Sequence, residues 1–156
     1  LWGWGQNYHG AVGSNKVLVR HSSPVQVGTR TDWASVSHGA NGGAENPIFG
    51  ITTAGHLYGW GSNSNGGIGD GTVVKRSVPV QIGSLNHWHK MGPGAGNTVA
   101  VQTNGTLWGW GYNERGAVGD GTVIYRSSPV QIGSLTVWAD CVGGKNAMLG
   151  IKGSTP

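Results

Sequence analysis

Leu107-Trp108-Gly109-Trp110-Gly111 is the stretch that decides the fold, because it occurs three times in the chain. The earlier copies are Leu57-Tyr58-Gly59-Trp60-Gly61 and Leu1-Trp2-Gly3-Trp4-Gly5, so the copies start 56 and 50 residues apart. A further period of 50 ends at Pro156, and the 156 residues therefore divide into repeats 1–56, 57–106 and 107–156. Repeats of this length are typical of solenoids and propellers, in which each unit buries its apolar face on its neighbours.

The composition indicates a folded, all-β chain. Glycine supplies 31 residues, well above its usual share of ~7%, but without the strict three-residue period of collagen. Eight tryptophans argue against disorder, and short apolar runs separated by Gly, Asn and Asp indicate strands. No apolar stretch approaches the ~20 residues that cross a bilayer, so we expect no membrane insertion.

The charge distribution and the single cysteine argue against a nucleic-acid-binding protein and against a disulfide or thiolate metal site. The net charge of +4 comes from scattered Lys and Arg residues that form no dense patch, so we do not expect a nucleic-acid partner. Cys141 stands where the other repeats have Val36 and Met91, which favours a small buried apolar residue over a disulfide or a thiolate metal ligand. The chain opens at Leu1 inside a repeat, which suggests a piece of a longer protein.

Each repeat contains four predicted strands, the number found in a propeller blade. The aromatic-glycine strand comes first, and in two repeats a tight turn marked by Asp-Gly-Thr follows it (70–72 and 120–122). The second strand opens with Pro and is therefore expected at a sheet edge (24–28, 79–83 and 129–133). The third begins at a Trp, is rich in small residues and suits a central position, and the fourth covers 48–52, 98–102 or 148–152. Extra residues around 41–46 indicate a loop insertion on one face.

The strands and turns of each repeat resemble those in repeats of the regulator of chromosome condensation family, particularly the bacterial and phage versions. The resemblance rests on Gly116-Ala117-Val118-Gly119-Asp120-Gly121-Thr122, on Arg126-Ser127-Ser128-Pro129-Val130-Gln131-Ile132 and on Asn104-Gly105-Thr106 before the aromatic strand. It covers the whole chain, although residues 152–156 lack the Asn-Gly-Thr turn. It implies a β-propeller of which three repeats form only part of a seven-bladed ring. It also implies one of several functions: nucleotide exchange on a small GTPase, β-lactamase inhibition, or a surface or virion module.

The repeats and the blades are expected to be out of phase. Counted from the inner strand outward, residues 33–83 and 88–133 make two whole blades, and residues 1–28 and 138–152 make two half-blades. Each half-blade leaves an edge of unpaired backbone groups, which invites pairing with more chain. Further repeats of the same polypeptide are the expected source, and a second copy packed head to tail is the alternative.

The sequence offers little for catalysis or for metal binding. Only six acidic residues occur, and there is no Gly-x-Ser-x-Gly elbow and no phosphate-binding Gly-Lys-Thr loop, so we expect neither an enzyme nor a bound cofactor. His87 and His89 would share one strand face, but no third ligand lies nearby in the sequence. Asp70 and Asp120 are interpreted as turn caps rather than Ca²⁺ ligands, because each loop has one carboxylate.

All eight tryptophans fall at repeat-equivalent stations, which favours core packing over stacking on sugars or bases. The predicted core tryptophans are Trp4, Trp60, Trp110, Trp33, Trp88 and Trp138. Recognition is expected at loop positions that vary between repeats, since loops on a rigid scaffold can vary without disturbing the core. The predicted interaction residues are Tyr8, His9, Ser64, Asn65, Glu114, Arg115 and Tyr125, together with 17–21.

We therefore predict a non-enzymatic propeller scaffold for protein–protein or surface contact, in particular a virion or bacterial surface structural module located outside the cell or on the virion. A carbohydrate-binding, lectin-like module that uses Trp and polar loop groups is the first alternative. An exchange-factor-like regulator of a small GTPase is the second.

Overall fold

The computed structural model describes residues 1–39 and 46–153, and the regular elements of these residues are all strands. The strands are β1 (Trp2–Asn7), β2 (Val19–Gln26), β3 (Trp33–His38), β4 (Pro47–Thr52), β5 (Leu57–Gly61), β6 (Arg76–Gln81), β7 (Trp88–Pro93), β8 (Asn97–Gln102), β9 (Leu107–Gly111), β10 (Arg126–Gln131), β11 (Trp138–Gly143) and β12 (Met148–Lys152). The predicted all-β class is thereby confirmed. The insertion predicted around 41–46 lies outside the described residues except for Asn46.

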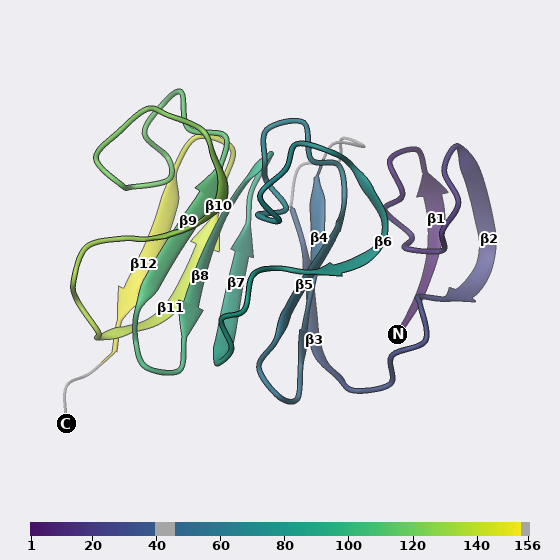
Figure 1. Cartoon of the computed structure of the whole chain (residues 1–156), viewed down its shortest axis with the longest axis horizontal. Coiled ribbons are helices and arrows are strands. Elements are labelled where there is room, and N and C mark those ends of the chain that lie inside the picture. The colour runs from purple at the N-terminus through teal and green to yellow at the C-terminus, as the bar shows by residue number, and fades with distance from the viewer. Residues whose placement is uncertain (40–45, 154–156) are drawn as a thin grey trace.

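The strands form a row of antiparallel sheets (Figure 1). Among the described residues, two sheets have four strands, in the orders β3-β4-β5-β6 and β7-β8-β9-β10. A two-stranded sheet, β1-β2, lies at one end of the row, and another, β11-β12, lies at the other end. Each four-stranded sheet is one blade of a partial propeller, because consecutive strands of the chain are neighbours in the sheet.

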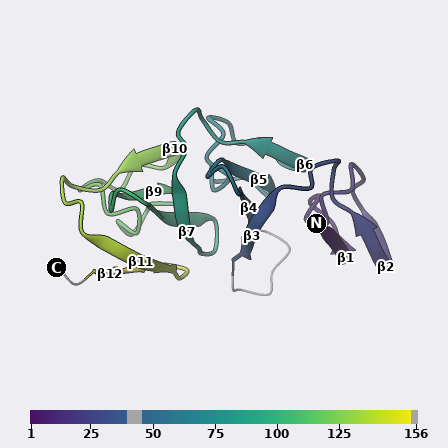
Figure 2. The ribbon, with the colours of Figure 1, turned by 90° about the horizontal axis from the view of Figure 1, so that it is seen from below.

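The blades are arranged along an arc, with β3, β7 and β11 on its inner side (Figure 2). β7 contacts both β3 and β4 of the preceding blade, and β11 contacts β7 and β8 in the same way. The strands β2, β6 and β10 lie on the outer side of the arc. The third strand of each sequence repeat therefore occupies the central position that its small residues predict.

The outer strands begin earlier than the sequence predicts. β6 and β10 are edge strands, as their prolines indicate, but they start at Arg76 and Arg126, before Pro79 and Pro129. The register shifts between Gly59 and Gly61, and again between Arg126 and Val130, so each proline lies in a bulge of the ladder. A proline inside a bulge does not interrupt the strand, because no ladder hydrogen bond requires its missing N–H.

The core lies between the blades rather than within one. A single cluster of buried apolar residues joins Phe49, Leu57 and Ile68 of one blade to Trp88 and Trp110 of the next. The Trp110 ring meets Phe49 edge-on at 6.1 Å between ring centroids and meets Trp88 at 6.0 Å. Each four-stranded sheet is therefore stabilised by its neighbour, as repeat architectures require.

A tryptophan of each complete blade also donates a hydrogen bond to the loop of the preceding repeat. Trp60 Nε1 donates to the Ala11 carbonyl at 2.9 Å, and Trp110 Nε1 donates to the Gly67 carbonyl at 2.8 Å. Gly69 lies against the Trp110 indole with a φ of 86°, so a side chain there would meet both steric and backbone strain. This contact explains Gly69 and its counterpart Gly13, which lies against Trp60 in the same way.

Five of the six tryptophans predicted for the core are buried or half-buried. Trp60, Trp88 and Trp110 are buried, and Trp33 and Trp138 are half-buried. Trp4 is the exception: its exposed fraction is 65%, against 2% for Trp60 and 0% for Trp110 at the same station. The prediction for Trp4 is wrong because Trp60 and Trp110 are covered both by the loop of the preceding repeat and by an inner-strand Trp of their own sheet, and the described residues supply neither cover to Trp4.

Candidate protein-interaction face

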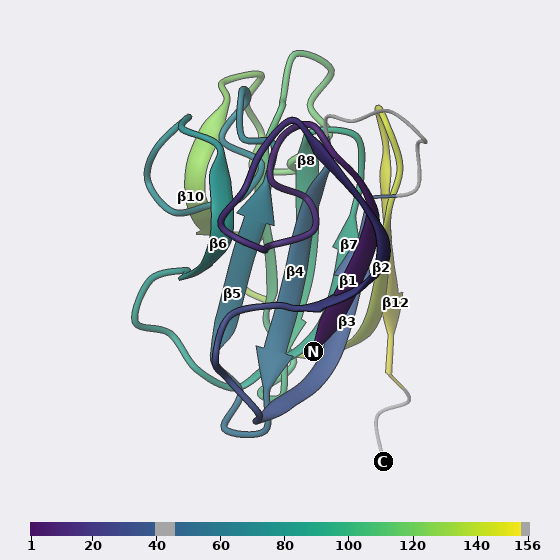
Figure 3. The same ribbon diagram turned by 90° about the vertical axis from the view of Figure 1, so that its right-hand side faces the viewer.

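Three long loops emerge at the same end of the blades, between β1 and β2, β5 and β6, and β9 and β10 (Figure 3). We call the surface formed by residues 8–18, 62–75 and 112–125 the loop face. A buried asparagine holds each of the last two loops from inside. The side-chain oxygen of Asn113 accepts from Val118 N at 2.8 Å, and its amide nitrogen donates to the carbonyls of Thr122 at 3.1 Å and Ile124 at 3.0 Å. Asn63 makes the equivalent bonds in the loop before it.

An aspartate and an arginine clamp the same loops from outside. Asp120 Oδ1 accepts from Thr122 N at 3.0 Å and from Thr122 Oγ1 at 2.8 Å, while Oδ2 accepts from Arg126 Nε at 2.6 Å. Burial opposes ionisation of Asp120, but these hydrogen bonds and the arginine charge outweigh it and lower its pKa to about 2. Asp70, Thr72 and Arg76 form the same clamp, and the pKa of Asp70 is likewise lowered. The prediction that these aspartates cap turns is confirmed.

The first repeat replaces this aspartate–arginine clamp with a contact between a serine and a histidine. Ser14 stands in place of the aspartate, and its hydroxyl lies 3.0 Å from His21 Nε2. Asn7 keeps its bridging role, because it accepts from Val12 N at 2.9 Å and donates to the Lys16 carbonyl at 2.6 Å. The asparagine is therefore the common element of all three loops, and the Asp–Arg pair is a feature of two of them.

The clamped loops present aliphatic pairs to solvent. Val73 and Val74, and at the same station Val123 and Ile124, are all exposed, and Leu18 is exposed in the first repeat. Sequence reasoning missed the two pairs because recognition was expected at loop positions that vary between repeats, whereas aliphatic residues recur at these positions. The sequence did contain a sign of their exposure. Both pairs directly follow the Gly-Thr of the turn and precede the outer strand, so they lie in a loop.

The third repeat adds a polar cluster to the loop face. The Tyr125 and Tyr112 hydroxyls both donate to the Glu114 carboxylate at 2.7 Å, and the two rings lie 5.2 Å apart. These hydrogen bonds lower the pKa of Glu114 and raise that of Tyr112, and the bond to Glu114 raises the pKa of Tyr125 to about 12. Of the predicted interaction residues, Glu114 and Tyr125 are thus brought together, and Tyr112, which was not predicted, completes the cluster.

The other predicted interaction residues are distributed over the three loops. Tyr8, Ser64 and Arg115 are exposed, whereas His9 and Asn65 are half-buried. Hydrogen bonds from Arg20 and then from Gln6 lower the pKa of Tyr8. The loop face therefore combines exposed aromatic and aliphatic groups with cations such as Arg115, on turns that are fixed from both sides.

The described residues contain no group of three or more His, Cys, Asp or Glu side chains that could hold a metal ion. No helix in the part of the chain that the structure describes has the length and apolar character needed to cross a membrane.

The chain is similar to several known proteins. The regulator of chromosome condensation (RCC1) repeat matches residues 54–101 and 104–148. The human probable E3 ubiquitin-protein ligase HERC6 is 31% identical over 90 residues, which cover 56% of this chain and 8% of that protein.

Solved structures resemble nearly the whole chain. Human WBSCR16 superposes with a TM-score of 0.80 at 20% identity, over 98% of this chain and 40% of that structure. Prp20p of Saccharomyces cerevisiae, described with its binding to Gsp1p and histones, gives 0.76 at 20% identity, over 97% and 39%. The chain thus spans about two fifths of these structures and a small part of HERC6.

Proposed function

This chain belongs to the regulator of chromosome condensation (RCC1) repeat family, and from that premise we propose that it is a non-enzymatic propeller scaffold whose loop face binds a protein partner. The observation that carries the proposal is the pairing of rigid loop clamps with exposed apolar pairs on one face. A pre-organised surface loses little conformational entropy when it binds, so its contacts contribute more of their energy to affinity.

The chemistry of the loop face suits a protein partner that presents both apolar and acidic groups. Tyrosine and arginine are enriched in protein interfaces, and the face offers Tyr125, Tyr112 and Arg115 beside the aliphatic pairs. Asp70 and Asp120 are already neutralised by Arg76 and Arg126, whereas Lys16, Lys75 and Arg115 have no carboxylate partner among the ion pairs of the described residues. A partner with carboxylates would complement these cations. The binding of yeast Prp20p to Gsp1p and histones supports protein as the kind of ligand.

The test is cross-linking mass spectrometry on partners captured by the folded chain. A specific partner should cross-link to lysines and introduced photo-reactive residues within 73–75 and 123–125. Ile124→Lys and Tyr125→Ala should each weaken its capture at least tenfold, whereas Lys90→Ala, an exposed change on the inner strand β7, should not. Cross-links that map to the inner strands, or equal capture by Ile124→Lys and Lys90→Ala, would refute the proposal.

Within this function we propose a structural role at a virion or bacterial surface, supported by the Gly-Asp-Gly-Thr and Trp-rich form of the repeats. Binding of the folded chain to a purified surface or tail protein, lost in Tyr125→Ala, would be the expected result. A carbohydrate ligand is the competing outcome: specific retention on a glycan array would favour the lectin-like alternative and count against the protein-binding scaffold.

A second candidate function, nucleotide exchange on a small GTPase, is favoured by the structural likeness to Prp20p. It is tested by the release of a fluorescent guanine nucleotide from small GTPases in the presence of the chain. Acceleration that persists in Ile124→Lys would favour this function over binding through the loop face.

A further inference from the structure

The first loop of the loop face holds an exposed leucine in a strained backbone conformation. Leu18 has a φ of 61°, in the left-handed region that bulky residues rarely adopt. Its exposed fraction is 72%, the largest among the large apolar side chains of the described residues. Burial of the side chain within this part of the chain therefore does not offset the strain.

Contacts on the buried side of the loop hold Leu18 in this conformation. Leu18 N donates to the Asn7 carbonyl at 3.0 Å, and Asn7 Nδ2 donates to the Lys16 carbonyl at 2.6 Å. Asn7 is itself fully buried. Leu18 also directly precedes Val19, where β2 begins. The leucine is therefore presented at a fixed point of the loop face.

The exposure is a property of this place in the repeat. Repeat 57–106 has a further repeat on each side, and its residues before the outer strand, Val73, Val74 and Lys75, are exposed as well. None of these three has a positive φ, whereas Leu18 does. Exposed aliphatic residues are thus common to the loops, and the strained leucine is particular to the first loop.

Two cations flank the apolar residues 17–19. Lys16 and Arg20 are both exposed, and neither takes part in the ion pairs of the described residues. Each cation lies two residues from Leu18 in the sequence. The segment therefore presents an apolar centre between two positive charges.

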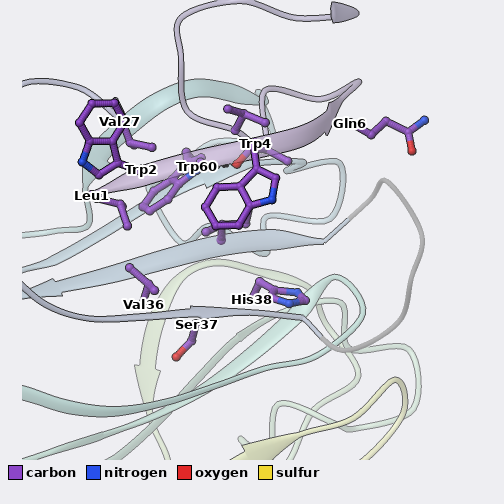
Figure 4. Close-up of a pocket in the computed structure, with 13 residues that line it drawn as sticks. Leu1, Trp2, Trp4, Gln6, Val27, Val36, Ser37, His38 and Trp60 are labelled. Carbon is purple, nitrogen blue, oxygen red and sulfur yellow. Dashed lines mark hydrogen bonds between the residues drawn. The ribbon is translucent and has the colours of Figure 1, made fainter. Parts of the chain in front are cut away.

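The guanidinium of Arg20 is held in place by Tyr8. A side-chain hydrogen bond with Arg20 is the main cause of the lowered pKa of Tyr8, and a bond with Gln6 is the second. Gln6 lies at the end of β1 and extends away from Trp4 and Trp60 (Figure 4). The group formed by Tyr8, Gln6 and Arg20 is therefore directed toward the first loop.

We propose that Leu18 is an apolar anchor for an acidic protein partner: it enters an apolar pocket of the partner, and Lys16 and Arg20 pair with carboxylates on the rim of that pocket. This role rests on the proposed function and specifies the chemistry of the partner. Backbone strain that internal packing does not offset is typical of groups that are pre-formed for a ligand. A guanidinium that is held in place can form two parallel hydrogen bonds with a positioned carboxylate, which a folded protein offers and the mobile headgroups of an anionic membrane do not.

The first test separates the strain from the side chain. Leu18→Asn and Leu18→Ala both remove the leucine, but asparagine tolerates the left-handed region and alanine does not. Leu18→Asn should therefore unfold at a higher urea concentration than Leu18→Ala. The same two changes at Val73, an exposed residue of the loop face without a positive φ, should show no such advantage for asparagine. A midpoint for Leu18→Asn that is equal to or below that of Leu18→Ala would overturn the proposal.

The second test is the binding of a labelled peptide in which leucines are flanked by glutamates, measured by fluorescence anisotropy. The control peptide carries lysine in place of each glutamate and should bind about tenfold more weakly or not at all. Leu18→Asn should weaken binding of the glutamate peptide about tenfold, because the buried leucine is lost. Lys90→Ala, an exposed change on β7, should leave the binding unchanged.

The outcomes distinguish the anchor from the loop face as a whole. Absence of binding to the glutamate peptide, or equal binding by wild type and Leu18→Asn, would overturn the role of Leu18. Binding to phosphatidylserine vesicles in preference to the glutamate peptide would overturn it as well. If Ile124→Lys still weakens capture of the cross-linked partner, the proposed function stands without this anchor. Capture that neither Ile124→Lys nor Leu18→Asn weakens contradicts both.

Discussion

Truncation of Trp110 tests whether the blades are stabilised mainly by their interface. Trp110 has an exposed fraction of 0%, and its indole lies against Phe49 and Trp88. Trp110→Ala removes this buried ring, which costs about 3–5 kcal/mol in typical cores. It also removes the hydrogen bond to the Gly67 carbonyl, worth about 1 kcal/mol, and two aromatic contacts. We therefore expect a loss near the upper end of that range, about 5 kcal/mol.

The same station supplies the control. Trp4 is largely exposed and has no hydrogen bond to a preceding loop among the described residues, so Trp4→Ala should change stability by less than about 0.5 kcal/mol. The free energy of unfolding is measured by urea titration, with the slope checked for constancy. If the two truncations cost the same, the reasoning about the blade interface is refuted.

Three further predictions concern the loop clamps and the cysteine. The folded pKa of Asp120, about 2, lies below its unfolded value of ~3.9, so its contribution to stability is present above pH ~4 and is lost as the pH falls through about 2. Asp120→Asn should therefore lower stability at pH 7 and flatten its decline between pH ~4 and ~2 in thermal melts; an unchanged acid profile would contradict the clamp. EDTA should leave the melting temperature unchanged, because Arg76 and Arg126 already occupy the aspartates, and a drop reversed by Ca²⁺ would show that they ligate metal. Burial, and to a lesser extent the charge of Asp140, raises the pKa of the Cys141 thiol to about 12. A thiol reagent at pH 8 should therefore label the native chain at least tenfold more slowly than the urea-unfolded chain. Comparable labelling rates would mean that the thiol is accessible in the native chain.

The fold could be predicted because its information is local and repeated. Alternation of aromatic residues and glycine specifies a strand, Asp-Gly-Thr specifies a turn, and the spacing of Trp88 and Trp138 marks where each inner strand begins. Because the same pattern occurs three times, the assignment of strands and turns does not depend on any single segment of the sequence. The early start of β6 escaped prediction because a bulge permits proline inside a strand, which depends on the pairing partner.

The loop face was only partly predictable, because its properties depend on contacts between segments. Glu114 and Tyr125 stood out as residues that vary between repeats, but their contact with each other and with Tyr112 requires the folded loop. Trp4 and Trp60 carry the same motif, and their different exposure depends on which strands lie beside them rather than on their own sequence. Repetition therefore identifies stations reliably, while burial at a station depends on neighbouring sheets.

The offset between sequence repeat and blade has a consequence for how such a chain can grow by gene duplication. Residues 57–106 supply the outer strands β5 and β6 of one sheet and the inner strands β7 and β8 of the next. A duplicated copy of this segment would be inserted at the turn between Gln102 and Leu107, outside any ladder. Every existing outer strand would still pair with an inner strand of the same repeat position, and the row would gain one blade. Tandem duplication of ~50 codons would thus preserve the strand pairing of each existing sheet.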